Sequence, residues 1–186
     1  MALVPTRIAQ HFYNEVMSNI HEVCILGAGV VGQVLAVALA QSHRRVALVG
    51  SAQHSNAQPD VRAYALNLSS RQLLEQWGLW PGDSAVTPVE CIQVWGDDGS
   101  NILFPGETQS PLSWIVDVPA LEHALHAHVA SSAQIDRVDQ PVPAQLTIVC
   151  EGRFSATRSQ LGVSRLRRPY GQVALATRVR AEHPHG

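Results

Sequence analysis

A glycine-rich turn between two apolar segments constrains the fold of this chain more than any other feature. Residues 24–40 read CILGAGVVGQVLAVALA, and the turn matches the pattern G-x-G-x-x-G at Gly27, Gly29 and Gly32. Only a glycine readily takes the backbone conformations of so tight a turn, and only a glycine lets a strand and a helix pack this closely. The pattern therefore predicts a strand, a sharp turn and a helix in immediate succession.

The segments on either side of the turn predict a βαβ unit. The run Val23–Leu26 is apolar and reads as a buried strand, and residues 30–42 read as a helix packed on it. The β-rich run at residues 44–50 supplies a second strand. We expect an α/β Rossmann-like fold with a mainly parallel sheet, in which Val23–Leu26 is a central strand. Its neighbours should be residues 46–49 and 146–150.

In this context the glycine turn predicts a dinucleotide site. The first glycine permits the turn, the second lets the backbone approach a pyrophosphate, and the helix N-terminus offers amide donors. The residues that we expect to hold the phosphates are Gly27, Ala28, Gly29, Val30 and Gly32. A glycine turn without a ligand is the alternative, and the βαβ context argues against it.

The end of the second strand departs from the usual pattern. An acidic residue is expected there to bind the ribose hydroxyls, but this chain has Gly50, and no acid follows before Asp60. Contact with the adenosine is therefore expected to be weaker, or to pass to Ser51 or to a backbone group.

The remaining chain predicts further elements of both kinds. Residues 68–80 read as a helix capped by Ser69 or Ser70 and ended by Gly78, and Asp98-Gly99 marks a hairpin. Further elements are a helix at 118–130, a buried strand at 144–150, a short helix within 154–162 and a strand at 170–182.

The segment DVRAYALNLSSRQLLEQWGLW, residues 60–80, resembles the FAD-dependent monooxygenases of the UbiH/UbiF type, the ring hydroxylases of ubiquinone biosynthesis. That family has the pattern D-x-R-x-x-A-L-x-x-S-x-x-L-L-x-x-L-G-L-W after its dinucleotide fold. The resemblance implies that Arg62 is the family's arginine that runs along the flavin.

Two further segments carry the resemblance. LTIVCEGRFSATR is similar to the group's second fingerprint, D-G-x-x-S-x-x-R: Glu151 replaces the aspartate, while Gly152, Ser155 and Arg158 keep the pattern. LSWIVDVPALEHAL resembles the family's helix-opening segment, with Pro119 where many members have an arginine. The resemblance implies that Glu151, Gly152 and Arg158 contact the cofactors.

The resemblance implies FAD as cofactor, NAD(P)H as electron donor and O2 as co-substrate, with a small aromatic or prenylated-quinone precursor hydroxylated on its ring. The flavin carries the chemistry in this group, so we expect no catalytic acid–base residue in the chain. We expect an N-terminal extension over 1–20, an FAD-binding domain over 21–168, and the start of a β-rich substrate domain over 169–186. On this interpretation the chain is the N-terminal part of a longer enzyme, and alone it should bind FAD weakly or not at all and lack activity.

Composition excludes several other classes. The formal net charge of −2 leaves no basic surface for nucleic acid. Three distant cysteines indicate reduced core residues, and His123, His126 and His128 lack the spacing of a zinc helix, so no metal site is expected. No signal peptide is recognised at the N-terminus. We expect a cytoplasmic protein, at most peripheral to the inner membrane or associated with a biosynthetic complex, of unknown oligomeric state.

Two other functions stay open. Gly50 and Pro119 favour a degenerate nucleotide-fold module that has lost its cofactor and serves a protein complex. A plain dehydrogenase is a weaker alternative, because it gives no role to Arg62 or to the second fingerprint. A yellow protein with a flavin absorption band would favour the monooxygenase.

Overall fold

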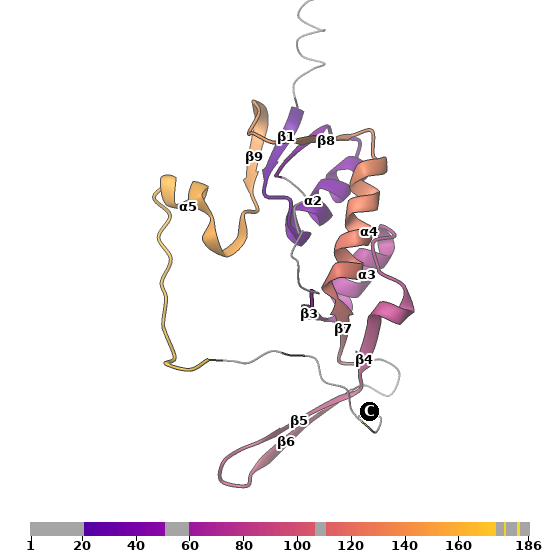
Figure 1. Ribbon diagram of the computed structural model, residues 1–186, viewed down its shortest axis with the longest axis vertical. Coiled ribbons are helices and arrows are strands. Elements are labelled where there is room, and N and C mark those ends of the chain that lie inside the picture. The colour runs from indigo at the N-terminus through magenta and orange to yellow at the C-terminus, as the bar shows by residue number, and fades with distance from the viewer. Residues whose placement is uncertain (1–20, 51–59, 107–110, 174–176, 178–181, 183–186) are drawn as a thin grey trace, which may run out of the picture. The chain divides into compact units, whose positions relative to one another are not determined.

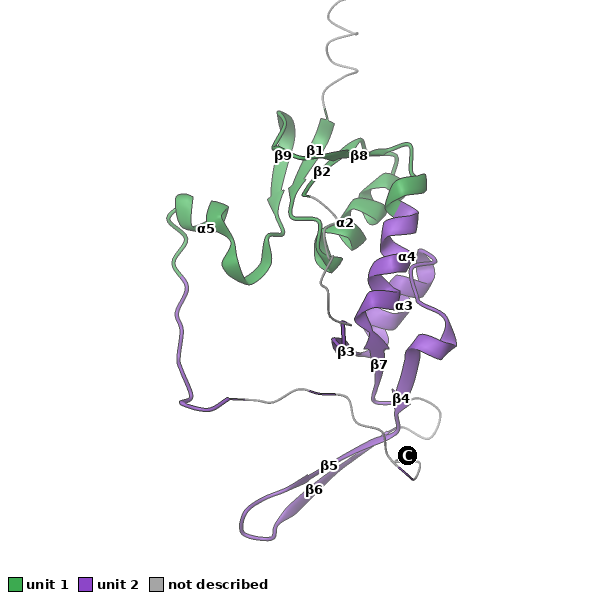
Figure 2. Ribbon diagram, in the orientation of Figure 1, with its two compact units in different colours: residues 1–52, 129–164 green, residues 53–128, 165–186 purple. Residues whose placement is uncertain are grey.

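The computed structural model describes residues 21–50, 60–106, 111–173, 177 and 182. The chain divides into two compact units (Figure 2), one of residues 1–52 and 129–164 and the other of residues 53–128 and 165–186. The division falls within a single helix, α4 (Val118–Ser131).

The first unit is built on a four-stranded parallel sheet (Figure 1). Its strands are β1 (His21–Leu26), β2 (Val46–Val49), β8 (Ile135–Val138) and β9 (Ala144–Val149), in the order β8-β2-β1-β9. β1 pairs with β2 on one side and with β9 on the other, both in parallel. The predicted central position of residues 23–26, between residues 46–49 and 146–149, is confirmed.

Apolar side chains fill both faces of this sheet near its centre. Cys24, Leu26 and Ala47 form one buried cluster, against which partly buried residues of the 138–144 segment pack. Ile25 and Leu48, which are register partners, are almost fully buried. Helix α2 (Val30–Gln41) packs against β1, β2 and β8. A glycine turn on β1 is therefore held by a rigid core.

The second unit combines helices with a small antiparallel sheet. Its strands β3 (Ala63–Leu66), β7 (Ser113–Asp117) and β4 (Val86–Val89) lie in that order, with β7 in the middle. Helix α3 (Leu68–Gln76) and helix α4 contribute buried leucines to this unit, and the 3-10 turn η1 (Asp83–Ala85) precedes β4. The guanidinium of Arg71 lies 4.6 Å from the ring centre of the buried Trp114.

A separate hairpin, β5 (Cys91–Trp95) with β6 (Asn101–Pro105), also belongs to this unit (Figure 1). Gly99 has φ +83°, which confirms the turn predicted at Asp98-Gly99. The cross-strand pairs Ile92–Phe104 and Val94–Ile102 place four apolar, exposed side chains on one face.

The structure corrects several expected boundaries. Helix α3 ends at Gln76, just before the predicted stop at Gly78. Its cap is Asn67, whose side chain accepts from the backbone amide of Ser70, instead of Ser69 or Ser70. Gly78 follows the helix end with φ +67°, as predicted. The strands β3, β4, β7 and β8 were not predicted. The strand expected at 170–182 lies largely outside the described residues, and residues 170–173 are not in a strand.

The helix predicted at 118–130 is confirmed as α4, with Pro119 in its first turn and the Asp117 carboxylate accepting from the amide of Ala120. The short helix is α5 (Ala156–Gln160), preceded by the 3-10 turn η2 (Gly152–Phe154). Among the described helices, none has the length and hydropathy needed to cross a membrane.

Candidate cofactor-binding site

The glycine turn follows β1 directly and leads into α2. Gly27 has φ +113°, and a Cβ there would lie 2.5 Å from the carbonyl oxygen of Cys150. A Cβ on Gly32 would overlap the carbonyl oxygen of Gly27. Both positions therefore require glycine to let the turn, the helix and the end of β9 pack together.

Gly29 differs from the other two glycines. Its backbone is extended, with φ −74° and ψ −178°, and a Cβ there would meet nothing within 4 Å. The fold alone places no demand on this position. The space that a side chain would occupy is open, as the approach of a ligand to the backbone requires.

The N-terminus of α2 is available for an anion. Gly29 is its N-cap, no side chain of the described residues caps it, and its first turn holds no acidic residue. The first amides of a helix have no partner within the helix, and the helix dipole favours negative charge there. The open cradle at Gly29 and these donors fit the pyrophosphate of a dinucleotide.

Gln33 holds the turn from the inside and was not singled out from the sequence. It is 2% exposed, and its Nε2 donates to the carbonyl oxygen of Ala28 at 2.9 Å, while its Oε1 has no partner among the described residues. The signal for it was a polar residue in an otherwise apolar helix, directly after the third glycine.

The second fingerprint lies beside the glycine turn. The carbonyl of Cys150 and the amide of Glu151 are the atoms that a Cβ on Gly27 would strike, and the amide of Cys150 donates to the carbonyl oxygen of Leu26 at 2.7 Å. Two segments more than 110 residues apart in sequence therefore meet at one edge of the sheet.

The side chains of this fingerprint bind one another. The Glu151 carboxylate accepts from the Ser155 hydroxyl at 2.6 Å and from the amide and hydroxyl of Thr157, and these bonds lower the pKa of Glu151. Ser155 caps α5, and the Arg158 guanidinium donates to the carbonyls of Gly152 and Arg153. Glu151 and Arg158 thus order the loop in this structure.

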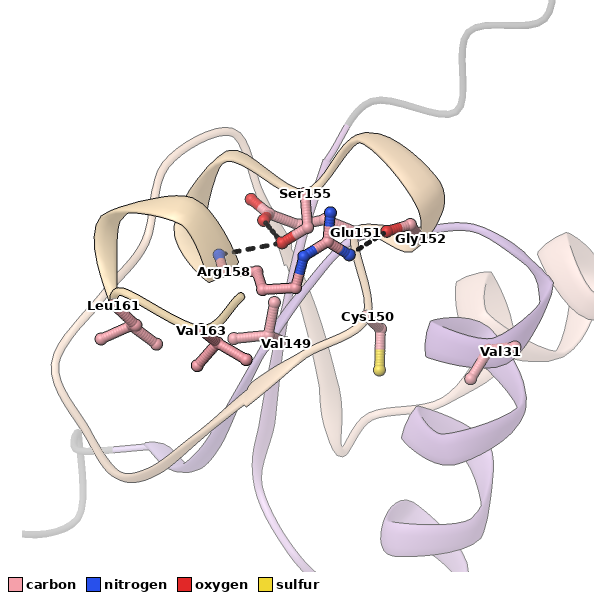
Figure 3. Close-up of a pocket in the computed structure, with 9 residues that line it drawn as sticks. All are labelled: Val31, Val149, Cys150, Glu151, Gly152, Ser155, Arg158, Leu161 and Val163. Atoms are coloured by element: carbon pink, nitrogen blue, oxygen red, sulfur yellow. Dashed lines mark hydrogen bonds between the residues drawn. The ribbon is translucent and has the colours of Figure 1, made fainter. Parts of the chain in front are cut away.

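A hollow of about 420 Å³ opens between this loop and α2 (Figure 3). It brings three of the predicted site residues, Glu151, Gly152 and Arg158, to one wall. The remaining lining residues are Val31, Val149, Cys150, Ser155, Leu161 and Val163. Burial raises the pKa of the Cys150 thiol above its usual value.

Gly50 lies against the turn at the end of β2. It has φ +130°, and a Cβ there would lie 3.3 Å from the amide nitrogen and the Cβ of Ala28. In this backbone conformation a carboxylate side chain would be strained, and its Cβ would be in tight contact with the turn. Ser51 lies outside the described residues.

Arg62 belongs to the other unit. Its guanidinium binds the Asp60 carboxylate through Nε and Nη2, at 2.6–3.0 Å, and the Glu122 carboxylate at 3.2 Å. The hydrogen bonds to Asp60, followed by the charge of Glu122, raise the pKa of Arg62. The predicted site residues thus fall into two groups: those on the turn and second fingerprint, which meet, and Arg62.

No family model matches the chain. Among curated proteins, it is 27% identical over 194 residues to the 3-demethoxyubiquinol 3-hydroxylase of Escherichia coli, covering 89% of this chain and 50% of that protein. It is 28% identical to the ubiquinone hydroxylase UbiL of Rhodospirillum rubrum, over 90% of this chain and 45% of that protein. The chain thus spans about half the length of these relatives.

Solved structures show the same fold. PqsL of Pseudomonas aeruginosa, a probable FAD-dependent monooxygenase, superimposes with a TM-score of 0.66 at 18% identity, over 82% of this chain and 48% of that one. p-Nitrophenol 4-monooxygenase of Pseudomonas putida gives a TM-score of 0.60 at 18% identity, over 77% of this chain and 44% of that one. In sequence the chain resembles the hydroxylases of ubiquinone biosynthesis, and its fold is the Rossmann-like fold of the FAD-dependent monooxygenases.

Proposed function

We propose that this protein binds FAD at the glycine turn and acts as an FAD-dependent ring hydroxylase of the ubiquinone-biosynthesis type. One observation carries the proposal: the backbone at Gly29, at an uncapped helix N-terminus, is open, and packing does not require a glycine there. Gly27 and Gly32 are explained by packing, whereas Gly29 is explained by a ligand that needs the space.

The chain's residues have distinct parts in this proposal. The pyrophosphate lies against residues 27–30 and Gly32, where it accepts hydrogen bonds from the first amides of α2. The loop with Glu151, Gly152 and Arg158 closes the same edge of the sheet and excludes water from the phosphates. Arg62 and Ser51 are proposed as further cofactor contacts, on the resemblance for Arg62 and on sequence position for Ser51.

When bound, FAD would supply the redox chemistry of such a hydroxylase, in which NAD(P)H is oxidised, one atom of O2 enters the aromatic ring and the other leaves as water. The substrate class proposed is a small aromatic or prenylated-quinone precursor. The described residues that meet at the sheet edge bind and shield the cofactor rather than transfer protons.

The test begins with the protein expressed from its complete reading frame. We expect a yellow protein with flavin absorption, saturable quenching of FAD fluorescence, and NAD(P)H oxidation that is stimulated by a quinone precursor. A folded protein that binds no FAD at millimolar concentration would contradict the proposal and favour the cofactor-free module. FAD binding with hydride transfer to a carbonyl substrate but no hydroxylation would favour a reductase.

We further propose a peripheral association with the membrane, because a prenylated substrate resides in the bilayer. Sedimentation with anionic phospholipid vesicles, compared with sedimentation of an unrelated flavoprotein, tests this part. Protein that stays entirely in the supernatant at low salt would contradict it without touching the cofactor assignment.

A further inference from the structure

The end of β2 leaves one group of the proposed cofactor without its usual partner. A dinucleotide fold commonly places a carboxylate there for the ribose hydroxyls. In this chain the position is Gly50, which carries no side chain for the ribose, and any side chain placed there would be strained at φ +130° and in tight contact with Ala28. A carboxylate that binds the ribose in this chain would therefore come from another segment at the same edge of the sheet.

The neighbouring strand β8 ends beside Gly50. β2 and β8 are parallel with Val49 opposite Val138, and the amide of Gly50 donates to the carbonyl oxygen of Val138 at 3.1 Å. The next residue along the chain is Asp139, and it is exposed. Adjacent strands lie about 4.8 Å apart, so Asp139 leaves the sheet one strand away from the position of the missing acid.

Asp139 ends its strand at the edge where the glycine turn opens. In a parallel sheet all strands end at the same side, so Leu26, Val49 and Val138 end together. Gly27 donates its amide to the carbonyl of Val49, which ties the turn to the end of β2. The order along this edge is therefore the turn, Gly50 and Asp139.

The other acids that the structure describes in this unit, Glu22, Asp136 and Glu151, have structural partners. Asp136, on the same strand, accepts from His21 and Arg45, and Glu22 binds Arg44. Glu151 caps α5. Asp139, by contrast, forms no hydrogen bond or ion pair with any residue that the structure describes, so its carboxylate is not committed to holding that part of the fold together.

We propose that Asp139 is the ribose-binding carboxylate of the cofactor site and replaces the acid that Gly50 cannot provide. Its side chain accepts hydrogen bonds from the hydroxyls of the adenosine ribose of FAD. This proposal rests on the proposed function, because it requires the dinucleotide to lie on the glycine turn. It transfers the contact from the second strand to the strand beside it.

The experiment measures FAD binding to the protein from its complete reading frame by fluorescence quenching. Asp139→Ala should raise the Kd for FAD about 10- to 100-fold, the loss expected for a hydrogen bond to a charged group. Asp139→Asn should raise the Kd for FAD by less, since its amide oxygen still accepts a hydrogen bond. The matched control is Asp136→Asn, which removes an acid from the same strand at a position away from this edge and should leave the Kd unchanged.

A second measurement identifies the group that Asp139 binds. ADP and 2′-deoxy-ADP compete with FAD for the adenosine half of the site, and the wild type should bind ADP more tightly. In Asp139→Ala this preference should disappear, whereas a merely structural effect would weaken both competitors equally. A preference that survives in Asp139→Ala but is lost in Ser51→Ala would overturn the proposal in favour of Ser51.

Gly29→Leu separates this proposal from the function on which it rests. If Gly29→Leu abolishes FAD binding while Asp139→Ala leaves it unchanged, the cofactor assignment stands and the role of Asp139 is wrong. If neither substitution changes the Kd, or the wild type binds no FAD, both are wrong. Thermal unfolding of each variant confirms that the protein is folded.

Discussion

Replacing Gly29 tests the cofactor assignment most directly, because the fold itself does not need this glycine. The φ of −74° suits any residue, and the added Cβ meets nothing within 4 Å. Gly→Ala at a compatible position stabilises a protein by about 0.4–1 kcal/mol, because it lowers the conformational entropy of the unfolded chain. An N-cap glycine replaced by alanine loses a similar amount. The free energy of unfolding of Gly29→Ala should therefore differ from wild type by less than about 1 kcal/mol, or about 2–4 °C in Tm.

Binding of FAD should respond quite differently. A methyl group in the space of the pyrophosphate removes at least one amide–phosphate hydrogen bond, worth about 1.5–3 kcal/mol. The Kd should therefore rise about 10- to 100-fold in Gly29→Ala, and binding should be lost in Gly29→Leu. The assay is a titration of FAD fluorescence, paired with a thermal unfolding curve for each variant.

Gly82 and Gly32 provide the controls. Gly82 has φ −62°, is also an N-cap, and has open space at its Cβ, so Gly82→Ala should change Tm by no more than Gly29→Ala does and should leave the Kd unchanged. Gly32→Ala should instead lower the free energy of unfolding by about 3 kcal/mol, the upper end for overpacking, because the new Cβ overlaps a backbone carbonyl. The reasoning is refuted if Gly29→Leu stays folded and binds FAD with the wild-type Kd.

Three further substitutions test the local structure. Glu151→Gln should lower Tm at neutral pH. Because the pKa of Glu151 is lower in the folded state than its usual value of 4.5, the carboxylate stabilises the fold above about pH 4.5, and this stabilisation fades as the pH falls through the lowered pKa. The Tm values of variant and wild type should therefore converge in acid. Arg62→Met should lower the free energy of unfolding in urea by about 1 kcal/mol or less, since the arginine is partly exposed. A larger loss would contradict this and would mean that Glu122, 12% exposed, is left as an unpaired buried charge. Trp114→Ala should cost about 3–5 kcal/mol by the same assay, because the side chain is 4% exposed, and an unchanged midpoint would show that the second unit does not depend on it.

The parallel sheet could be predicted because its inner strands, β1 and β2, are continuous runs of apolar residues in the sequence. β1 and β2 lie on either side of a glycine pattern whose chemistry fixes their connection, and residues 144–149 are long and apolar enough to stand out. β4 was missed because Pro88 argues against a strand. The structure accommodates the proline because β4 is an edge strand, where a missing amide costs little.

The candidate site was predictable to the extent that its contacts are local. The glycines and the 151–158 loop follow from short patterns, and the structure brings them together as the strand order requires. The ion pair of Arg62 with Glu122, 60 residues away, depends on the pairing of β3 with β7 and has no signal in the sequence. The helix cap at Asn67 was misplaced because three nearby residues, Asn67, Ser69 and Ser70, can all cap, and only the register of the first turn decides between them.

The three glycines of the turn are under different structural constraints. Gly27 and Gly32 are fixed by contacts with Cys150 and with each other, so a descendant that stopped using the cofactor would still keep them in order to fold. Gly29 is under no such constraint and would drift to other residues within such a lineage. Among descendants and duplicates of this gene, the identity of residue 29 should therefore reveal which copies still bind a dinucleotide, while the glycine pattern as a whole would persist in both.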